Sequence, residues 1–382
     1  MAYKTYEVAV IGGGVTGSAI AYHLAKAGVK VVLVEKGDIC SGASATNPGF
    51  CVLTYREDPV VMELALQQRR EWDDLSQELG VNLEYECTGG LIPISNQQEL
   101  EVLAGLVQNC HNWGLKQVEI VKSDRAVEQE RALDPTKIIA AVYCPWEGRI
   151  NPFKLTLSLA DRARLLGAHI MTGAEVTGME VARGNVKTIH TLQGDIKADV
   201  IFCAAGAWTR KVLSLAGASL PVEYERGEAM VSIASPPTIR GMVTDGSFFV
   251  REKEKPPMVA GACLAQTKSG NIVLAQATTQ IKNHDRSSTY AGPIAVAKKV
   301  LYYFPKLSDL EILRMWGGIV AYTPDRQPLF GFLPNPKNLF VVVGFHSAIG
   351  IAPVLGRIVK DVYLKGKSQY DFTAYSPLRF LQ

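Results

Sequence analysis

The chain has 382 residues, of which 47% are hydrophobic and 20% are charged, and its formal net charge at pH 7 is +3. This length exceeds what one simple core needs, so we expect two domains or one domain with a large insertion. Basic and acidic residues are interspersed, which gives no reason to expect a nucleic-acid partner. The seven cysteines are scattered and form no CxxC pair, which argues against a disulfide framework, a zinc site or an iron–sulfur site and favours a reducing compartment.

The N-terminus runs almost directly into a predicted strand, without the basic and apolar regions of a secretory signal. No stretch approaches the roughly 20 apolar residues that a transmembrane helix needs. These two features predict a cytoplasmic protein without a transmembrane segment.

Residues 8–36 carry the most informative pattern in the chain. An apolar run leads into Gly12, Gly14 and Gly17, a helical stretch follows, and a second apolar run ends at Glu35. This is the order of a dinucleotide-binding strand–turn–helix–strand, in which the glycines allow a tight turn, an approach to the pyrophosphate and close helix packing. The first amides of the helix point at the phosphates, and the acid accepts hydrogen bonds from the ribose.

The remaining elements follow from apolar spacing. Helices are predicted over residues 59–79, 96–114 and 292–305, and a helix followed by a strand over 151–173. Strands are predicted over 89–95, within 184–208 and as short runs through the rest of 221–314. Residues 337–366 are predicted to form a strand, a glycine-containing turn and a helix. No low-complexity linker separates these segments, so the domains are expected to interleave.

Three distant segments favour FAD over NAD as the dinucleotide. The loop 41–44 offers small residues and hydroxyls, residues 202–208 end a buried strand with a glycine turn, and the turn 344–350 leads into a helix. Together with "NPG", "GRINPFKL", "PVEYERGE" and "WGGIVAYTPDRQPLFG", they stand in the order found in one family. The chain resembles the D-amino-acid oxidase superfamily of FAD-dependent oxidoreductases, in its glycine oxidase, sarcosine oxidase and hydrogen cyanide synthase branch.

The resemblance implies an α/β (α+β) fold, with a discontinuous Rossmann-like FAD-binding domain and an interleaved antiparallel-sheet substrate domain. The FAD-binding domain is expected over residues 1–85, 146–222 and 315–382, and the substrate-binding domain over 86–145 and 223–314. The implied cofactor-binding residues are Gly12, Gly14, Val15, Thr16, Gly17, Glu35, Lys36, Ser41, Gly42, Ser44, Asn47, Pro48, Gly49, Val176, Ala205, Gly206, Trp208, Gly344, Ser347, Ala348, Ile349, Gly350 and Ile351.

Three positions depart from the family pattern. Gly318 stands near the position at which monomeric sarcosine oxidases tether FAD through a cysteine, so noncovalent FAD is expected unless another cysteine reaches the ring. Val320 stands where glycine oxidase-like enzymes place an arginine that grips the substrate carboxylate, and Phe249 stands where a tyrosine is expected. We therefore expect a more apolar cavity, in which free glycine is a poor substrate.

His346, Arg56 and Tyr322 are the candidate catalytic residues. His346 lies in the turn near the expected flavin ring, but such a histidine can also cap or pack a helix. Arg56 could reach the cavity or lie solvated on the surface, and Tyr322 could offer a hydroxyl or fill volume.

The implied reaction is oxidation of the C–N bond of a small amine or amino acid by hydride transfer to flavin N5, followed by hydrolysis of the imine. Two alternatives stay open. One is oxidation of a 2-hydroxy acid or glycerol phosphate, with His346 as the base. The other is a flavin subunit of a heteromeric dehydrogenase complex. The electron acceptor would be oxygen, a quinone or a partner subunit, and the resemblance to the heteromeric branch slightly favours a partner.

Overall fold

Two eight-stranded sheets organise the chain, which the computed structural model describes over residues 4–56, 58–254 and 256–381. The first sheet has the order β17-β18-β11-β1-β2-β8, with β10 paired to β11 and β9 paired to β10. The pairs between β18 and β8 are parallel. The strands of this sheet are β1 (Lys4–Ile11), β2 (Val31–Val34), β8 (His169–Met171), β9 (Val176–Ala182), β10 (Asn185–Thr191), β11 (Gly194–Cys203), β17 (Leu329–Phe332) and β18 (Leu339–Val343).

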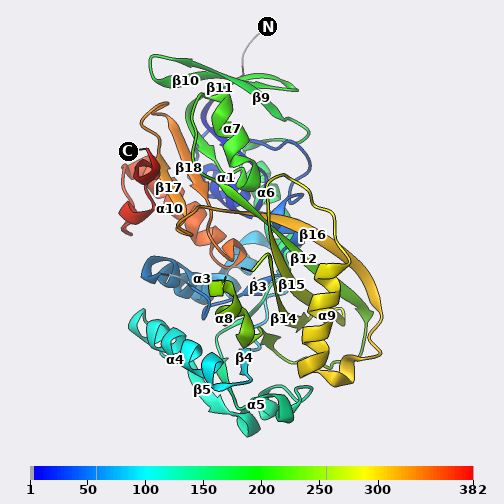
Figure 1. The fold of residues 1–382 in the computed structure, drawn as a ribbon. Coiled ribbons are helices and arrows are strands. Elements are labelled where there is room, and N and C mark those ends of the chain that lie inside the picture. Colours follow the sequence, from blue (N-terminus) through cyan, green and yellow to red (C-terminus); the bar gives the residue numbers. More distant parts are fainter. Residues whose placement is uncertain (1–3, 57, 255, 382) are drawn as a thin grey trace.

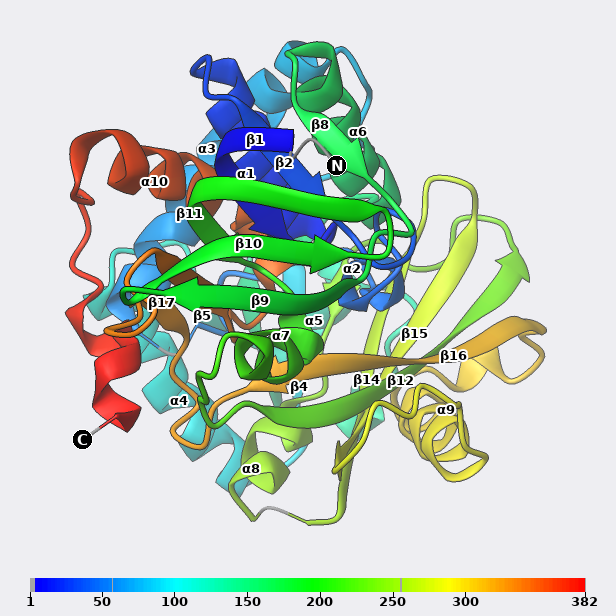
Figure 2. The same ribbon diagram turned by 90° about the horizontal axis from the view of Figure 1, so that it is seen from above.

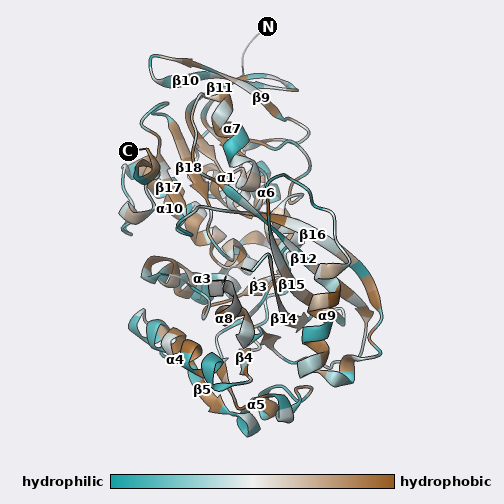
Figure 3. Cartoon of the chain, in the orientation of Figure 1, coloured by the Kyte–Doolittle hydropathy of each residue, from teal (hydrophilic) through white to brown (hydrophobic). Residues whose placement is uncertain are grey.

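Both faces of the first sheet are buried, which explains the continuous apolar runs of its central strands. Val8 and Val10 of β1 pack into one core, whereas Ala9 and Ile11 pack into another. Figure 3 shows β17 and β18 as largely brown, in agreement with the buried β18. Helices α1 (Val15–Lys26), α3 (Pro59–Leu79), α6 (Pro152–Leu165) and α10 (Ala352–Lys365) contribute to the first core, and α7 (Thr209–Leu215) contributes to the second.

Polar caps fix the predicted helices. Asp58 accepts hydrogen bonds from the amides of Val60 and Val61 at 2.8 and 3.0 Å, and Gly80 ends α3 in the left-handed conformation. Asn151 caps α6 in the same way. The helices predicted over 59–79, 96–114 and 292–305 are confirmed to within two residues at each end, as α3, α4 (Gln97–Asn112) and α9 (Ala291–Tyr303). The helix followed by a strand predicted over 151–173 is confirmed as α6 and β8.

The second sheet has the order β16-β12-β15-β14-β13-β4-β6-β5 and is antiparallel apart from the β13–β4 pair. Its strands are β4 (Gly90–Ile94), β5 (Glu119–Lys122), β6 (Ala140–Cys144), β12 (Glu223–Ala234), β13 (Met242–Val243), β14 (Met258–Gln266), β15 (Asn271–Ile281) and β16 (Ile312–Tyr322). Helix α9 packs on one face of this sheet through Val296, Val300 and Tyr303. Helices α4, α5 (Ser123–Gln129) and α8 (Gly246–Glu254) complete this half. Residues 246–254 form helix α8, so the prediction of short strands in this region was wrong there.

The chain alternates between the sheets, which confirms the predicted interleaved fold. Figure 1 shows α1, α7 and α10 with the first sheet at the top and α4, α5 and α9 with the second sheet below. Figure 2 shows β12 and β16 side by side as they run out beside α9. The expected boundary after residue 314 falls inside β16, whose pairing with β12 continues to Tyr322. We propose the division into two domains with this boundary moved to the end of β16.

Candidate active site

The turn between β1 and α1 forms one wall of a large cavity. Gly12 has a φ of +113°, and a side chain there would clash with the carbonyl of Ala204. A side chain at Gly17 would clash with the Gly12 carbonyl, so this glycine lets α1 pack closely on the turn. Gly14 lines the cavity, and a Cβ placed there would meet Ser44 Oγ at 3.3 Å. Gly14 therefore keeps space open for a ligand.

This cavity, which we call the dinucleotide cavity, has a volume of about 520 Å³. The amide of Val15, at the N-terminus of α1, donates to Ser44 Oγ at 2.9 Å and so holds the loop of α2 (Ala43–Thr46) beside the helix end. A helix N-terminus favours an anion. The predicted cofactor-binding residues that line the dinucleotide cavity are Gly12, Gly14, Val15, Thr16, Glu35, Lys36, Ser41, Gly42, Ser44, Val176, Ala205, Gly206, Trp208, Gly344 and Ala348.

Glu35 and Lys36 line the cavity beyond β2. Glu35 Oε2 accepts a hydrogen bond from the Gly13 amide at 2.7 Å, and Oε1 accepts one from the Gly37 amide at 2.8 Å. Because each carboxylate oxygen has a second lone pair, the held carboxylate can still accept from a ribose hydroxyl. Lys36 Nζ lies 3.4 Å from the ring centroid of Trp208, and burial lowers the pKa of this lysine.

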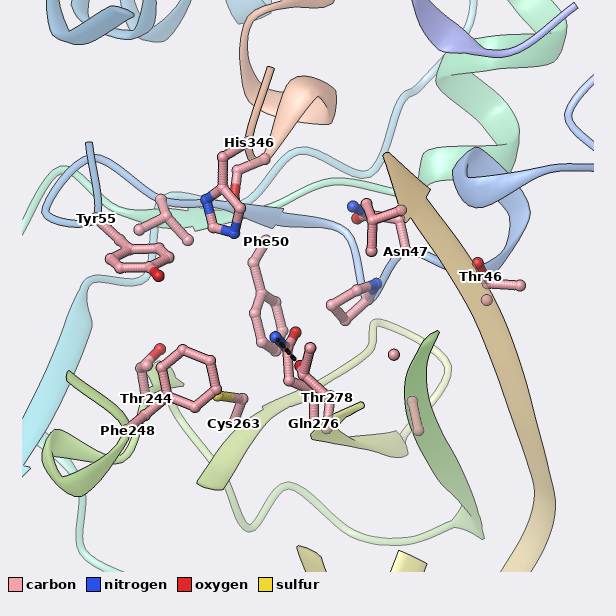
Figure 4. Close-up of a pocket in the computed structure, with 18 of the residues that line it drawn as sticks. Thr46, Asn47, Phe50, Tyr55, Thr244, Phe248, Cys263, Gln276, Thr278 and His346 are labelled. Carbon is pink, nitrogen blue, oxygen red and sulfur yellow. Dashed lines mark hydrogen bonds between the residues drawn. The ribbon is translucent and has the colours of Figure 1, made fainter. Parts of the chain in front are cut away.

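A second cavity of about 160 Å³ adjoins the first, because Ala43, Ile319 and Val320 line both. We call it the substrate cavity. It lies where the second sheet meets the turn after β18, and Figure 4 shows side chains entering it from opposite sides. Its aromatic lining residues are Phe50, Tyr55, Phe248, Phe249 and Tyr322. None of the described residues that line it is a lysine or an arginine.

Polar groups face one another across the substrate cavity. Gln276 and Thr278 enter from β15, opposite His346 and Asn47, and Gln276 Nε2 donates to Thr278 Oγ1 at 3.0 Å (Figure 4). Asn47 Oδ1 accepts from the Gly49 amide at 2.6 Å, which fixes the turn that carries it. The cavity therefore combines apolar walls with a few polar side chains, one of them the buried acidic residue Glu228, and this composition is typical of a small-molecule site.

His346 is held between two aromatic rings at the wall of the substrate cavity. Its ring is perpendicular to that of Tyr55 at 4.6 Å and stacks with that of Tyr322 at 6.1 Å. Its Nδ1 is buried and has no hydrogen-bond partner among the described residues. Burial, reinforced by the positive charges of Arg56 and Arg326, lowers the pKa of His346 to about 3. The imidazole is therefore neutral at physiological pH.

Comparison with known proteins identifies the family. The sequence profile of the FAD dependent oxidoreductase family matches residues 7–362. This chain belongs to that family. Its fold is similar to that of L-proline dehydrogenase from P. horikoshii, with a TM-score of 0.90, 27% identity and coverage of 100% and 99% of the two chains.

Two curated relatives match over nearly the whole chain. Glycine oxidase from Geobacillus kaustophilus is 28% identical, with 98% of this chain and 97% of that protein aligned. Sarcosine oxidase subunit beta from Rhodobacter capsulatus is 26% identical, with 98% and 87% aligned. The chain spans 45% of rat mitochondrial dimethylglycine dehydrogenase, to which it is 25% identical. The predicted membership of the D-amino-acid oxidase superfamily, the FAD dependence and the oxidoreductase activity are thus confirmed.

The dinucleotide cavity fits the FAD of this family. A Cβ at Gly14 would occupy the cavity, the α1 N-terminus suits a pyrophosphate, and the Glu35 carboxylate suits a ribose. Of the other predicted cofactor-binding residues, Asn47, Pro48 and Ser347 line the substrate cavity instead. Gly17, Gly49, Ile349, Gly350 and Ile351 line neither cavity, so their direct contact with FAD stays a prediction.

The candidate catalytic residues of this FAD-dependent oxidoreductase separate into two kinds. His346 and Tyr322 line the substrate cavity, whereas Arg56 lines neither cavity. Arg56 is buried, which corrects the expected alternative of a solvated surface role. Its guanidinium donates to the carbonyl of His346 at 3.0 Å and to that of Val52 at 2.6 Å. This geometry suits the positioning of the His346 turn rather than contact with a substrate.

The three departures from the family pattern all lie at the substrate cavity. A side chain at Gly318 would clash with Thr46, which explains the glycine at the expected tether position. Val320 and Phe249 contribute apolar surface, as expected. Cys263 lines the same cavity, but burial raises the pKa of its thiol to about 12, so the reactive thiolate is scarce.

Sequence reasoning missed Gln276, Thr278, Thr244 and Cys263 as cavity residues. The only signal was a pair of polar side chains two residues apart, within the apolar run "NIVLAQATT". Within the part of the chain that the structure describes, no group of three or more His, Cys, Asp or Glu side chains could hold a metal ion. No helix of that part is both long and apolar enough to cross a bilayer.

Proposed function

We propose that this protein oxidises the C–N bond of a small amine or amino acid, and that it prefers secondary or N-alkylated amines to free glycine. The pair of joined cavities carries this proposal, because a dinucleotide cavity opens onto a small, largely apolar one that no described lysine or arginine lines. The names of its relatives, which refer to glycine, sarcosine and L-proline, support the same substrate class.

FAD, when bound, supplies a flavin ring that accepts a hydride from the carbon beside the amine nitrogen. The residues of the chain hold that carbon in place and exclude water. The rings of Phe50, Tyr55 and Phe248 supply the apolar walls that keep water out.

His346 favours amine oxidation over alcohol oxidation. An amine that binds in the neutral form does not need to lose a proton before its carbon gives up a hydride, so no base is required. A neutral imidazole places no positive charge beside it. Oxidation of a 2-hydroxy acid or glycerol phosphate needs a base at the hydroxyl, and a histidine with a pKa of about 3 is a weak base.

Gln276 and Thr278 are the proposed anchors for the polar end of the substrate. They lie opposite His346, and the Gln276 amide and Thr278 hydroxyl can donate to a carboxylate or another acceptor. A carboxylate bound only by neutral donors gains less than one bound by an arginine fork. Apolar substituents on the amine must then supply part of the binding, which is why glycine should be poor.

Anaerobic bleaching of the bound flavin tests this proposal. Glycine, sarcosine, L-proline and larger N-alkylated amino acids are compared with lactate and glycerol 3-phosphate. We expect the secondary amines to reduce the flavin fastest, glycine to be slower, and the two alcohols to leave it oxidised. Reduction by lactate or glycerol 3-phosphate, with the amines inactive, would replace the proposal with the alcohol chemistry. Equal rates for glycine and the secondary amines would refute the substrate preference alone.

We further propose that the reduced enzyme passes electrons to a partner subunit or a quinone rather than to oxygen. The likeness to a protein named as a subunit of sarcosine oxidase supports a heteromeric assembly. The seven free cysteines fit the predicted cytoplasmic location. Rapid hydrogen peroxide formation by the isolated chain during turnover would overturn the choice of acceptor.

A further inference from the structure

We infer that Arg286 binds the pyrophosphate of FAD, and that residues 282–290, between β15 and α9, form a strap across the dinucleotide cavity. This segment comes from the second sheet, outside the sequence motifs that identify the cofactor site. Arg286 lines the dinucleotide cavity together with Ser41, Gly42 and Ala43. Arg286 therefore adds to the cavity a cation that lies outside the glycine turn of residues 12–17 and outside residues 202–208.

The position of Arg286 relative to α1 points to the phosphates. Its guanidinium donates to the Ser41 carbonyl at 3.1 Å, and the same loop carries Ser44, whose Oγ accepts from the Val15 amide. The guanidinium and the α1 N-terminus thus contact opposite ends of one four-residue loop. Both the α1 amides and the positive charge of Arg286 therefore line the cavity beside this loop, where an anion would gain from both.

The other cations of the cavity are already engaged. Lys211 Nζ lies 2.8 Å from Glu175, and Lys36 Nζ lies over the ring of Trp208. Arg286 has no carboxylate partner among the described residues; its described hydrogen bond goes to a carbonyl. Since a guanidinium matches phosphate oxygens with two parallel donors, Arg286 is the cation best suited to the pyrophosphate.

His284 anchors the strap to residues 207–208. Its Nε2 donates to the carbonyl of Ala207 at 2.9 Å, and its ring stacks on that of Trp208 at 5.1 Å with an angle of 18°. Its ring also contacts Tyr224 of β12 at 4.6 Å. Ala207 and Trp208 both line the cavity. The strap is therefore held at residues 207–208 and at the loop 41–44, and Arg286 lies two residues beyond His284.

Two further contacts set the path of the strap. A side chain at Gly317 would approach the carbonyls of Arg286 and Ser287 to 2.7 and 3.1 Å, so glycine lets β16 pass close beneath. Asp285 accepts from the Ser287 amide at 2.9 Å and pairs with Arg226 at 3.4 Å. These contacts hold the backbone on both sides of Arg286.

Equilibrium binding of FAD to the apoprotein, followed by quenching of flavin fluorescence, tests the inference without any substrate. We expect Arg286→Ala to raise the Kd for FAD about 10- to 100-fold, and Arg286→Lys to raise it less. Arg162→Ala, which removes an exposed cation from α6, is the matched control and should leave the Kd unchanged. His284→Ala should speed FAD dissociation, because it releases the strap.

Competition separates a phosphate contact from a general effect on the cavity. ADP and adenosine displace FAD from the same apoproteins, and only ADP should bind more weakly to Arg286→Ala. Circular dichroism confirms the fold of each variant, with Arg286→Gln as a second neutral replacement. A Kd for FAD within twofold of the parent for both neutral variants, or an equal loss of ADP and adenosine binding, would overturn the assignment. Either result would leave the proposed amine chemistry untouched.

Discussion

The two adjoining cavities are built in different ways. The dinucleotide cavity depends on the backbone, with Gly12 and Gly14 in its turn, the amides of α1 and a loop held by Ser44. The substrate cavity depends on side chains from segments far apart in the chain, such as Tyr55, Gln276 and His346. Backbone requirements restrict residue types locally, whereas a side-chain site can be rebuilt with different residues. For this reason the sequence alone predicts the cofactor, whereas it does not reveal the residues that anchor the substrate.

Replacement of Gly14 should have the largest effect. A Cβ there meets Ser44 Oγ at 3.3 Å but otherwise extends into the cavity, so Gly14→Val should fold and yet lose FAD binding by more than about 1,000-fold. Gly105→Val, at an exposed position of α4 with nothing within 4 Å, is the matched control. Flavin content and the Kd for FAD measure the outcome. A Gly14→Val protein that purifies with bound FAD would show that the backbone does not limit this site.

Removal of the Gln276 side chain should have a smaller effect, which is confined to the use of the substrate and leaves FAD binding unchanged. A hydrogen bond to a charged group contributes about 1.5–3 kcal/mol, so Gln276→Ala should lower kcat/KM about 10- to 100-fold for the best amine. Its Kd for FAD should not change. Gln280→Ala, on the exposed end of the same strand, is the control. Equal activity of the two variants would remove Gln276 from the list of anchors.

The pH dependence of the free energy of unfolding should show the lowered pKa of His346. The pKa of His346 in the folded protein is about 3, below the ordinary 6.5. The neutral imidazole therefore contributes fully to the stability of the fold above pH 6.5. This contribution is lost as the pH falls towards 3, because the unfolded chain then binds a proton that the folded chain does not. Between pH 7.5 and 5 this loss is about 2 kcal/mol in the free energy of unfolding. His346→Gln should flatten the decline by that amount in urea titrations. His23, with its pKa lowered to about 3 by burial, makes a similar contribution that remains in the variant.

His190→Gln provides the control for this measurement. His190 is partly exposed, and its hydrogen bond to Asp195 raises its pKa, which is the direction opposite to that of His346. Its replacement should therefore not flatten the decline between pH 7.5 and 5. Parallel curves for His346→Gln and the parent protein would contradict a His346 that stays neutral in the folded protein.

Replacement of Cys263 should have the smallest effect. Acid denaturation should release intact FAD from the parent protein, because Gly318 cannot form a thioether and the Cys263 thiol stays protonated. Cys263→Ala should release the same amount and keep its Kd for FAD within twofold of the parent value. Flavin that stays with the denatured parent chain but not with the variant would identify Cys263 as a tether.

Local signals account for the parts of the fold that were predicted. Helix α3 follows from its Asp58 cap, its proline at the next position and its terminal Gly80, all readable in sequence. Helix α8 was missed, because the run "SFFV" is typical of a strand. Its start depends on Asp245, which accepts from the Ser247 amide at 2.8 Å and from Tyr303 of α9 at 3.0 Å. Such a tertiary contact leaves no pattern in the neighbouring residues.

The same reasoning applies to the site. Glu35 and Gly206 have fixed places relative to a strand end, so their roles could be predicted. The role of Arg56 could not, because it depends on where the long side chain points in the folded protein. It is buried against two carbonyls instead of reaching the cavity. Arg286 carries no motif at all, and only the path of the strap brings it to the cofactor site.

A crystal structure of the FAD complex with a non-reactive secondary amine tests the central claim most directly. We expect the phosphates at the N-terminus of α1, the flavin ring at the junction formed by Ala43, Ile319 and Val320, and the amine beside Gln276 and His346. A flavin ring that remains wholly within the dinucleotide cavity, or an amine bound away from β15, would contradict it.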